Sequence, residues 1–181
     1  MSNSALITGS ILIAIVAGVG VFAWYATDGF SSSEPSAAER SLLGAEGATP
    51  FTDMAGDEVT LDTFLGSGQY IIVTSWASWC PQCGDQLADL NSFAATQEAA
   101  VSVVAVNRSE RSNQAERYLN SLPDTDMLHI ILDPDDRFYR DIGGYTVPET
   151  VVYDQAGEVV EHYHGVVSAA ALEELASDLD L

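Results

Sequence analysis

Two cysteines, Cys80 and Cys83, are the residues of this sequence whose type and spacing indicate chemistry most directly. They lie in the stretch SWASWCPQCGDQL, and the chain has no other cysteine. A zinc site normally needs four ligands, so a single pair argues against a metal clip. A disulfide that closes so short a loop constrains little chain entropy, which also disfavours a purely structural bridge. A reversible dithiol–disulfide pair is therefore favoured over a metal site, a structural bridge or two inert thiols.

The residues around the pair favour redox chemistry. A buried strand is expected to run through QYIIVTSWA towards Trp79, and a helix is expected to begin at the cysteines. Cys80 is then expected at the helix N-terminus, where unpaired N–H groups and the helix dipole stabilise a thiolate. Pro81 suits the first helical turn, where its missing N–H costs nothing. Cys83, one turn further on and more buried, is expected to attack the mixed disulfide formed through Cys80.

The elements that must position this pair alternate along the chain. Buried strands are predicted at residues 69–77, 100–108 and 128–132, an edge hairpin at 56–64, and a second hairpin at 149–154 and 158–164 around a turn at 155–157. Helices are predicted after the cysteines and at 112–122, 134–142 and 168–179, with Ser112 and Ser168 as N-caps. This order predicts an α/β sandwich with a mixed sheet.

The segment Ala5–Thr27 predicts a membrane anchor. It contains no charged residue, and about 20 apolar residues cross a hydrocarbon core of roughly 30 Å. A cleaved signal peptide would show a basic start and a shorter apolar run. No cysteine follows the segment, which excludes a lipoprotein anchor. We expect an N-terminal transmembrane anchor at residues 1–27, a flexible acidic tether at 28–47 and a folded domain at 48–181, placed outside the cytoplasm, where disulfides need managing.

The charge balance of the chain is strongly acidic. Its 27 acidic residues stand against six basic ones, all arginine, which gives a formal net charge of −21. Such a surface repels phosphate backbones and anionic lipid headgroups, so nucleic-acid binding is excluded. An ordinary acidic, soluble surface and adaptation to high salt both explain the excess, and the second concerns habitat, not activity.

Four segments together resemble a known family. These are TPFTDMAGDEVTLDTF, TSWASWCPQC, LDPDDRFYRDIGGYTVPETVVYDQAGEVV and HYHGVVSAAALEELA. Over about residues 49–180 the chain is similar to the membrane-anchored TlpA/ResA/DsbE (CcmG) subgroup of thioredoxin-fold proteins. The resemblance implies a thioredoxin-like fold, a redox-active Cys80–Cys83 disulfide without any other cofactor or metal, and a cis-proline at Pro148 that faces the disulfide. Backbone groups of Val147 would then pair with a substrate strand.

The sequence departs from the family pattern at two positions. Thr74 lies where thioredoxins carry a buried aspartate, and Gln86 lies where this subgroup often has a glutamate, so neither usual carboxylate is present. Asp85 and Glu149 are the remaining candidates for proton transfer; without them, water would deprotonate Cys83.

The aromatic and histidine residues near the motif carry weaker expectations. Trp76 is predicted to pack in the core, and Trp79 to lie at the surface near the disulfide, as a candidate for substrate contact. His162 and His164 alternate on one strand face and are interpreted as surface residues, not as metal ligands.

The leading hypothesis is a membrane-tethered, extracytoplasmic thiol–disulfide oxidoreductase that acts on protein thiols or disulfides. By resemblance its substrates include apocytochrome c, and its electron donor is a membrane carrier of the DsbD/CcdA kind. Two alternatives stay open: a dithiol oxidase that forms disulfides in secreted proteins, and a non-catalytic binding or assembly module on a thioredoxin scaffold.

Overall fold

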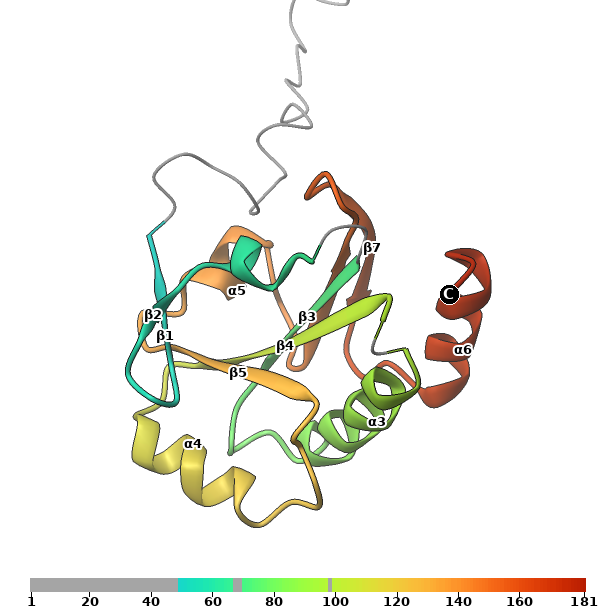
Figure 1. Cartoon of the computed structure of the whole chain (residues 1–181). Helices are drawn as coiled ribbons and strands as arrows, with labels where there is room; N and C mark the ends of the chain where they lie inside the picture. The colour runs from blue at the N-terminus through green and yellow to red at the C-terminus, as the bar shows by residue number, and fades with distance from the viewer. Residues whose placement is uncertain (1–48, 67–69, 98) are drawn as a thin grey trace, which may run out of the picture. The chain divides into compact units, whose positions relative to one another are not determined.

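The strands form one mixed sheet in a computed structural model that describes residues 49–66, 70–97 and 99–181 (Figure 1). Its order is β2-β1-β5-β4-β3-β6-β7. The strands are β1 (Phe51–Asp53), β2 (Glu58–Val59), β3 (Tyr70–Trp76), β4 (Val101–Arg108), β5 (Leu128–Asp133), β6 (Glu149–Tyr153) and β7 (Val159–His164). β3 runs parallel to β4 and antiparallel to β6, and β4 runs parallel to β5. The prediction of a mixed α/β sheet is thus confirmed.

Helices cover both faces of the sheet (Figure 1). They are η1 (Leu61–Phe64), α3 (Cys83–Thr96), α4 (Ser112–Leu119), α5 (Arg137–Asp141) and α6 (Ala169–Asp178). Because side chains alternate along a strand, Ile72 and Trp76 of β3 pack on the α3, α4 and α6 side, and Ile71 and Val73 pack on the η1 and α5 side. The β-branched runs of β3 and β4 therefore sit between two apolar layers.

The turns confirm two further expectations in kind, although the edge hairpin lies at residues 51–59 instead of 56–64, where Leu61–Phe64 form the 3-10 helix η1. β1 and β2 pair as an antiparallel hairpin at the edge of the sheet, and β6 and β7 pair around the predicted turn. Ser168 caps α6, because its hydroxyl accepts a hydrogen bond from the Ala171 N–H at 3.2 Å.

The helix after the cysteines begins later than predicted. β3 ends at Trp76, and α3 begins at Cys83, so Cys80 and Pro81 lie before the helix instead of in its first turn. The reason is local hydrogen bonding: the Cys80 N–H donates to Ala77 and the Cys83 N–H donates to Cys80, which gives two tight turns before the helical pattern begins.

Two other helix starts were predicted wrongly. Arg111, with extended backbone, is the N-cap of α4 instead of Ser112, since its carbonyl accepts the first helical hydrogen bond. α5 begins at Arg137, not at Pro134, because Asp136 has a left-handed φ of 57° that interrupts a right-handed helix. A carboxylate oxygen of Asp133 then accepts the Phe138 N–H at 2.8 Å.

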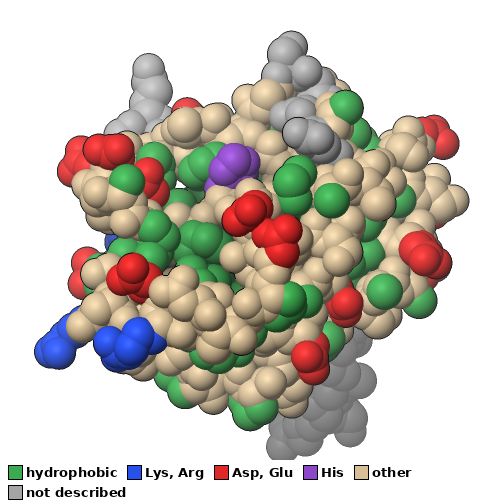
Figure 2. All heavy atoms as spheres, turned by 60° about the horizontal axis from the view of Figure 1, so that its bottom comes forward, with side chains coloured by type: hydrophobic (Ala, Val, Ile, Leu, Met, Phe, Trp, Pro, Cys, Tyr) green, Lys and Arg blue, Asp and Glu red, His purple; other side chains and the backbone are tan. Residues whose placement is uncertain are grey.

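The predicted anchor at Ala5–Thr27 and the tether lie outside the described residues. Within the part of the chain that the structure covers, none of the helices has the length and apolar run needed to cross a bilayer. Acidic side chains are spread over the face shown in Figure 2, whereas arginines gather at one edge of it.

Candidate functional site

The two cysteines form a disulfide at the end of β3. The Cys80 and Cys83 sulfurs are 2.12 Å apart, and both residues are almost fully buried. Cys83 opens α3 and packs in the same apolar cluster as Trp76, while Trp79, immediately before Cys80, is 58% exposed. Cys80, the predicted attacking residue, and Cys83, the predicted resolving residue, are thus joined by a disulfide bond, and the exposed Trp79 side chain lies beside them.

The cis-proline expected opposite the disulfide is present. The Val147–Pro148 peptide bond is cis, and the Val147 carbonyl oxygen lies 3.7 Å from the Cys80 sulfur. In the disulfide this sulfur has no proton to donate, but after reduction the Cys80 thiol can donate to that carbonyl. The Gly165 N–H donates to the Pro148 carbonyl at 3.0 Å, so the segment after β7 also reaches the site.

A buried cluster of three uncharged residues lies one helical turn from Cys83. In this neutral cluster, Gln86 donates its amide hydrogens to the hydroxyls of Thr74 and Thr150, each at 2.9 Å. The two hydroxyls are 2.9 Å apart, and the Gln86 carbonyl accepts the Val167 N–H at 2.9 Å. The positions that hold acids in related proteins are therefore filled here by a satisfied, non-ionisable network.

A second cluster joins a buried carboxylate to two part-exposed imidazoles. In this Glu149 cluster, one oxygen of the fully buried Glu149, Oε2, lies 3.0 Å from His162 Nε2 and 2.7 Å from His164 Nδ1. The other oxygen, Oε1, accepts the N–H groups of Tyr145 and Thr146, both at 3.0 Å. The histidines are part-exposed, at 24% and 39% of their side chains, so the surface interpretation missed their partner.

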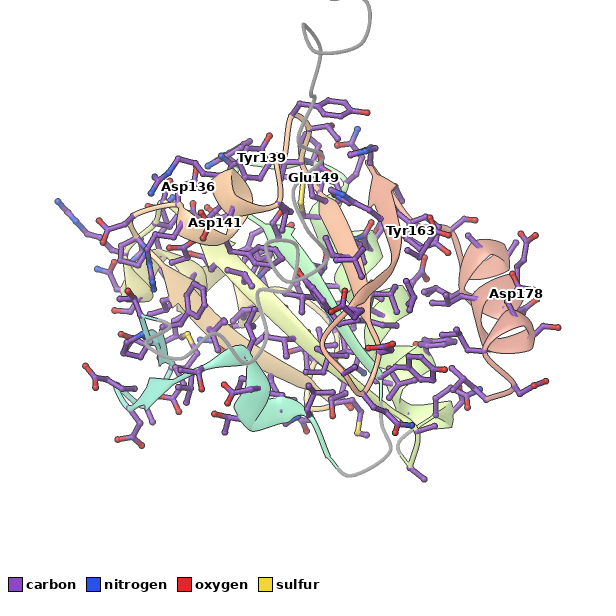
Figure 3. The ribbon with its side chains drawn as sticks, turned by 90° about the horizontal axis from the view of Figure 1, so that it is seen from above. Asp136, Tyr139, Asp141, Glu149, Tyr163 and Asp178 are labelled. Atoms are coloured by element: carbon purple, nitrogen blue, oxygen red, sulfur yellow. A yellow bond between two sulfur atoms is a disulfide. The ribbon has the colours of Figure 1, made fainter. Side chains whose placement is uncertain are left out.

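The contacts of Glu149 determine its protonation. Burial by itself would raise the pKa of this carboxyl, but the amides of Tyr145 and Thr146 and the hydrogen bond and charge of His164 outweigh it. The pKa of Glu149 is therefore below its ordinary value, and the group is a carboxylate at neutral pH. Figure 3 shows Glu149 at the same end of the sheet as Asp136 and Tyr139.

Neither candidate proton-transfer carboxylate lies in the neutral cluster. Asp85 is exposed on α3. Thr150 contacts Gln86 of α3, and its neighbour Glu149 must point to the opposite face of the sheet, because consecutive strand residues alternate. The structure brings Cys80, Cys83, Val147 and Pro148 together, and it leaves both acids away from the helix face that carries Gln86.

Glu110 is a structural residue of the site that the sequence analysis missed. Its carboxylate accepts the Ser78 N–H at 2.9 Å, the Ser78 hydroxyl at 2.6 Å and the Asn107 amide at 2.7 Å. It thereby holds the loop that precedes Trp79 and Cys80. Only the fold reveals this role, because Ser78 and Glu110 are 32 residues apart and the local pattern around Glu110 resembles that of any acid before a helix.

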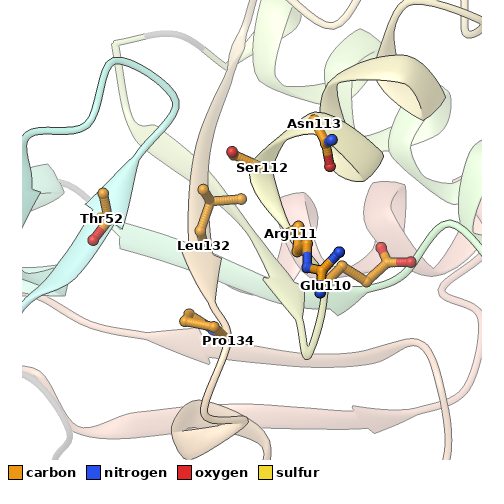
Figure 4. Close-up of a pocket in the computed structure, with 7 residues that line it drawn as sticks. All are labelled: Thr52, Glu110, Arg111, Ser112, Asn113, Leu132 and Pro134. Carbon is orange, nitrogen blue, oxygen red and sulfur yellow. The ribbon is translucent and has the colours of Figure 1, made fainter.

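An open pocket of about 520 Å³ is lined in part by Glu110 (Figure 4). Its lining residues are Thr52, Glu110, Arg111, Ser112, Asn113, Leu132 and Pro134. The Glu110 carboxylate in this lining is already engaged by Ser78, Asn107 and Gln114.

The two tryptophans lie as predicted. Trp76 is buried and stacks on Tyr118, with ring centroids 5.6 Å apart. Trp79 lies at the surface, and the Arg108 guanidinium is 5.9 Å from its ring centroid. Arg108 is itself fixed by two hydrogen bonds to the Asp136 carboxylate, at 3.0 and 2.6 Å. The exposed Trp79 ring beside the disulfide therefore has the fixed Arg108 guanidinium as its neighbour.

Sequence comparison places these features in a family. Residues 45–162 match the AhpC/TSA family. The chain is 30% identical over 138 residues to the thiol:disulfide interchange protein DsbE of Yersinia pestis, covering 74% of this chain and 70% of that one. It is 26% identical over 166 residues to the thiol:disulfide interchange protein HelX of Rhodobacter capsulatus, covering 91% and 89%.

Solved structures share the fold. A thiol:disulfide interchange protein DsbE from Chlorobium tepidum superposes with a TM-score of 0.63 at 25% identity, over 72% of this chain and 89% of that one. The structure of MTB dsbF matches with a TM-score of 0.65 at 19% identity, over 78% and 97%. The thioredoxin-like fold expected from the sequence is thereby confirmed.

Proposed function

The chain belongs to the AhpC/TSA family, among its DsbE- and HelX-type thiol:disulfide interchange proteins, and from this premise we propose that it exchanges disulfides with protein substrates outside the cytoplasm while tethered to a membrane. The observation that carries the proposal is the Cys80–Cys83 disulfide against the Val147–Pro148 segment, with 3.7 Å between the Cys80 sulfur and the Val147 carbonyl oxygen.

The exchange proceeds in two balanced steps. In the reducing direction the Cys80 thiolate attacks a substrate disulfide, which forms a mixed disulfide and releases one substrate thiolate. The Cys83 sulfur then attacks the Cys80 sulfur, which closes the Cys80–Cys83 bond and releases the second substrate thiolate. Two electrons pass to the substrate, and the proton of Cys83 leaves to water, because the neutral cluster beside it holds no base.

The substrate is a polypeptide with apolar side chains near its cysteines. Three large exposed apolar side chains come from the three segments that meet at the disulfide: Trp79 at 58%, Tyr145 at 72% and Val166 at 51% exposure. Backbone groups of Val147 add the polar component, by pairing with an extended substrate segment. Apocytochrome c fits this class, since it carries its cysteines in an unfolded chain.

The tether and the electron source complete the proposal. Ala5–Thr27 supplies the single-pass anchor, with residues 28–47 as the link to a domain outside the cytoplasm. Electrons reach the Cys80–Cys83 disulfide from a membrane carrier of the DsbD/CcdA kind. Family members named as thiol:disulfide interchange proteins support the reaction class, and the uncharged 23-residue run supports the membrane anchor.

Insulin reduction by the full-length chain with dithiothreitol tests the reaction. We expect Cys80→Ala to abolish the rate enhancement and Cys83→Ala to accumulate mixed disulfides that mass spectrometry can identify. Ser92→Ala, an exposed change on α3, is the matched control and should leave the rate unchanged. Equal rates for the wild type and Cys80→Ala would overturn the proposal in favour of a binding module.

The reduction potential decides the direction of electron flow. Equilibration with glutathione, followed by tryptophan fluorescence from Trp76 and Trp79, measures it. A reduction potential of about −270 mV, as for thioredoxin, supports a reductase, whereas a potential of about −120 mV supports the oxidase alternative.

A further inference from the structure

We propose that Glu149, His162 and His164 form a binding site for a divalent transition-metal ion of the zinc class. Among the residues that the structure describes, these three offer one ligand atom each, and the three atoms lie within 4.8 Å of one another. The site is separate from the cysteines in its chemistry: it uses two imidazole nitrogens and one carboxylate oxygen, and neither the redox reaction nor the family resemblance calls for it.

The backbone fixes the three ligands on one face of the sheet. Glu149 and His164 are directly paired across β6 and β7, and His162 is two residues from His164, so all three side chains point the same way. The Glu149 Oε2 atom is 3.0 Å from His162 Nε2 and 2.7 Å from His164 Nδ1. Ligands about 2.0–2.2 Å from a tetrahedral zinc ion are roughly 3.3 Å apart, and the three ligand atoms here all lie within 4.8 Å of one another, so small side-chain shifts seat the ion.

The surroundings of the three ligands are those of a supported metal site. The second carboxylate oxygen of Glu149 is held by the N–H groups of Tyr145 and Thr146, which leaves Oε2 as a single oriented ligand. The Tyr145 ring packs on the His164 ring, with centroids 4.4 Å apart, and the two histidine rings are 4.3 Å apart. The ligand positions are thus held before the ion arrives.

The donor set and its exposure select the class of ion. Two neutral imidazoles and one carboxylate match zinc sites that keep a fourth position open, and the same nitrogens suit copper and nickel better than magnesium or calcium. Because the histidines are partly exposed, the ion has a path from solvent. The net charge of −21 attracts cations to the surface.

A bound ion would connect β7 to the segment that precedes the cis-proline. Glu149 follows Pro148 directly, and its carboxylate already holds the amides of residues 145 and 146. An ion shared by Glu149, His162 and His164 therefore fixes Val147 and Pro148 relative to β7. This gives the metal a place beside the redox site without making it a participant in electron transfer.

Zinc titration of the oxidised full-length chain tests the proposal. Oxidation keeps both cysteines in their disulfide and out of coordination, and the chain is purified without a polyhistidine tag. Isothermal titration calorimetry is expected to show one saturable zinc ion with micromolar or tighter affinity. Substituting Co²⁺ gives a second readout, since inner-sphere nitrogen ligation produces visible d–d absorption bands.

Variants distinguish this site from zinc held loosely by surface acids. His162→Gln and His164→Gln should each weaken zinc binding at least roughly tenfold and abolish the cobalt bands. His129→Gln, which alters the third histidine of the chain, on β5, should leave both readouts unchanged. Circular dichroism checks folding, and His162→Gln alone suffices if the other variant is unstable. Absence of a saturable ion in the wild type, or equal binding by His162→Gln and His129→Gln, would overturn the site.

Discussion

Glu149 and Thr150 are consecutive residues of β6, yet their side chains enter two different chemical environments. Thr150 joins Thr74 and Gln86 in the neutral cluster on the α3 face, where every hydrogen-bonding group is paired and none titrates. Glu149 joins His162 and His164 on the opposite face, where all three groups are ionisable. The sheet therefore separates the buried acid–base chemistry of this region from the helix that carries Cys83.

This separation has a consequence for the redox pair. A buried base beside Cys83 would speed the formation of its thiolate, whereas an uncharged network leaves that proton to water. The Glu149 cluster, in contrast, is suited to holding charge, either its own or that of a metal ion. Four changes, taken from the largest expected effect to the smallest, test whether the two clusters differ in this way.

Replacing Gln86 by Leu should have the largest effect. It removes the hub of the neutral cluster and leaves the Val167 N–H without its partner, so we expect the free energy of unfolding to fall by about 3 kcal/mol. Urea denaturation followed by circular dichroism measures this change. Gln155→Leu, in an exposed turn, is the control and should cost less than about 0.5 kcal/mol. Similar losses for the two variants would show that the neutral cluster does not stabilise the fold.

Replacing Glu149 by Gln should cost about 2 kcal/mol at neutral pH, and this cost should depend on pH. Because the pKa of Glu149 is lowered in the folded state, the carboxylate contributes stability above its unfolded pKa, and that contribution disappears as the pH falls through the folded pKa. The difference between the wild type and Glu149→Gln should therefore shrink on acidification.

Urea denaturation at pH 7 and at several values below pH 5 measures the difference. Gln86→Leu is the matched comparison, since its cost comes from groups that do not titrate and should stay constant over the same range. A Glu149→Gln difference that is independent of pH would contradict the assignment of a buried carboxylate.

Replacing Gln86 by Glu moves ionisable chemistry to the α3 face. The new carboxyl would be buried among hydroxyls, which raises its pKa and makes it a proton acceptor near Cys83. We expect insulin reduction to quicken by up to roughly tenfold with a new pH dependence, as for general-base catalysis. Asp85→Asn, at an exposed neighbouring position, should leave the pH profile unchanged. An identical profile for Gln86→Glu and the wild type would show that Cys83 deprotonation does not limit turnover.

The chemistry of the Cys80–Cys83 pair could be predicted from the sequence much better than that of the neutral cluster and the Glu149 cluster. The cysteine pair and its strand are readable because each has a local signature of residue type and spacing, whereas the cis-proline of VPET was expected from the family resemblance. The alternation of strands and helices gave the α/β class for the same reason, although turn hydrogen bonds around Cys80 and the left-handed Asp136 displaced the helix starts.

The two clusters escaped prediction because they are made by strand pairing. Thr74 and Gln86 stand out in the sequence as departures from the family pattern, but Thr150 joins them only because β6 lies beside β3. The alternation of His162 and His164 was visible, but only the β6–β7 register places both against Glu149. A single sequence carries no local signal for these long-range registers.

Replacing Ser75 by Ala should have the smallest effect and gives the sharpest test of the separation. The Ser75 hydroxyl accepts the Glu149 N–H at 3.2 Å, while its neighbour Thr74 belongs to the neutral cluster. Each of Ser75→Ala and Thr74→Val should cost about 1 kcal/mol by urea denaturation. The Thr74 hydroxyl also lies 3.4 Å from the Glu149 carbonyl oxygen, a long contact, so we expect the two costs still to add within about 0.5 kcal/mol. Thr74→Val with Thr150→Val should not add, because those hydroxyls are in direct contact. Strong coupling between Ser75→Ala and Thr74→Val would show that the two faces act as one network.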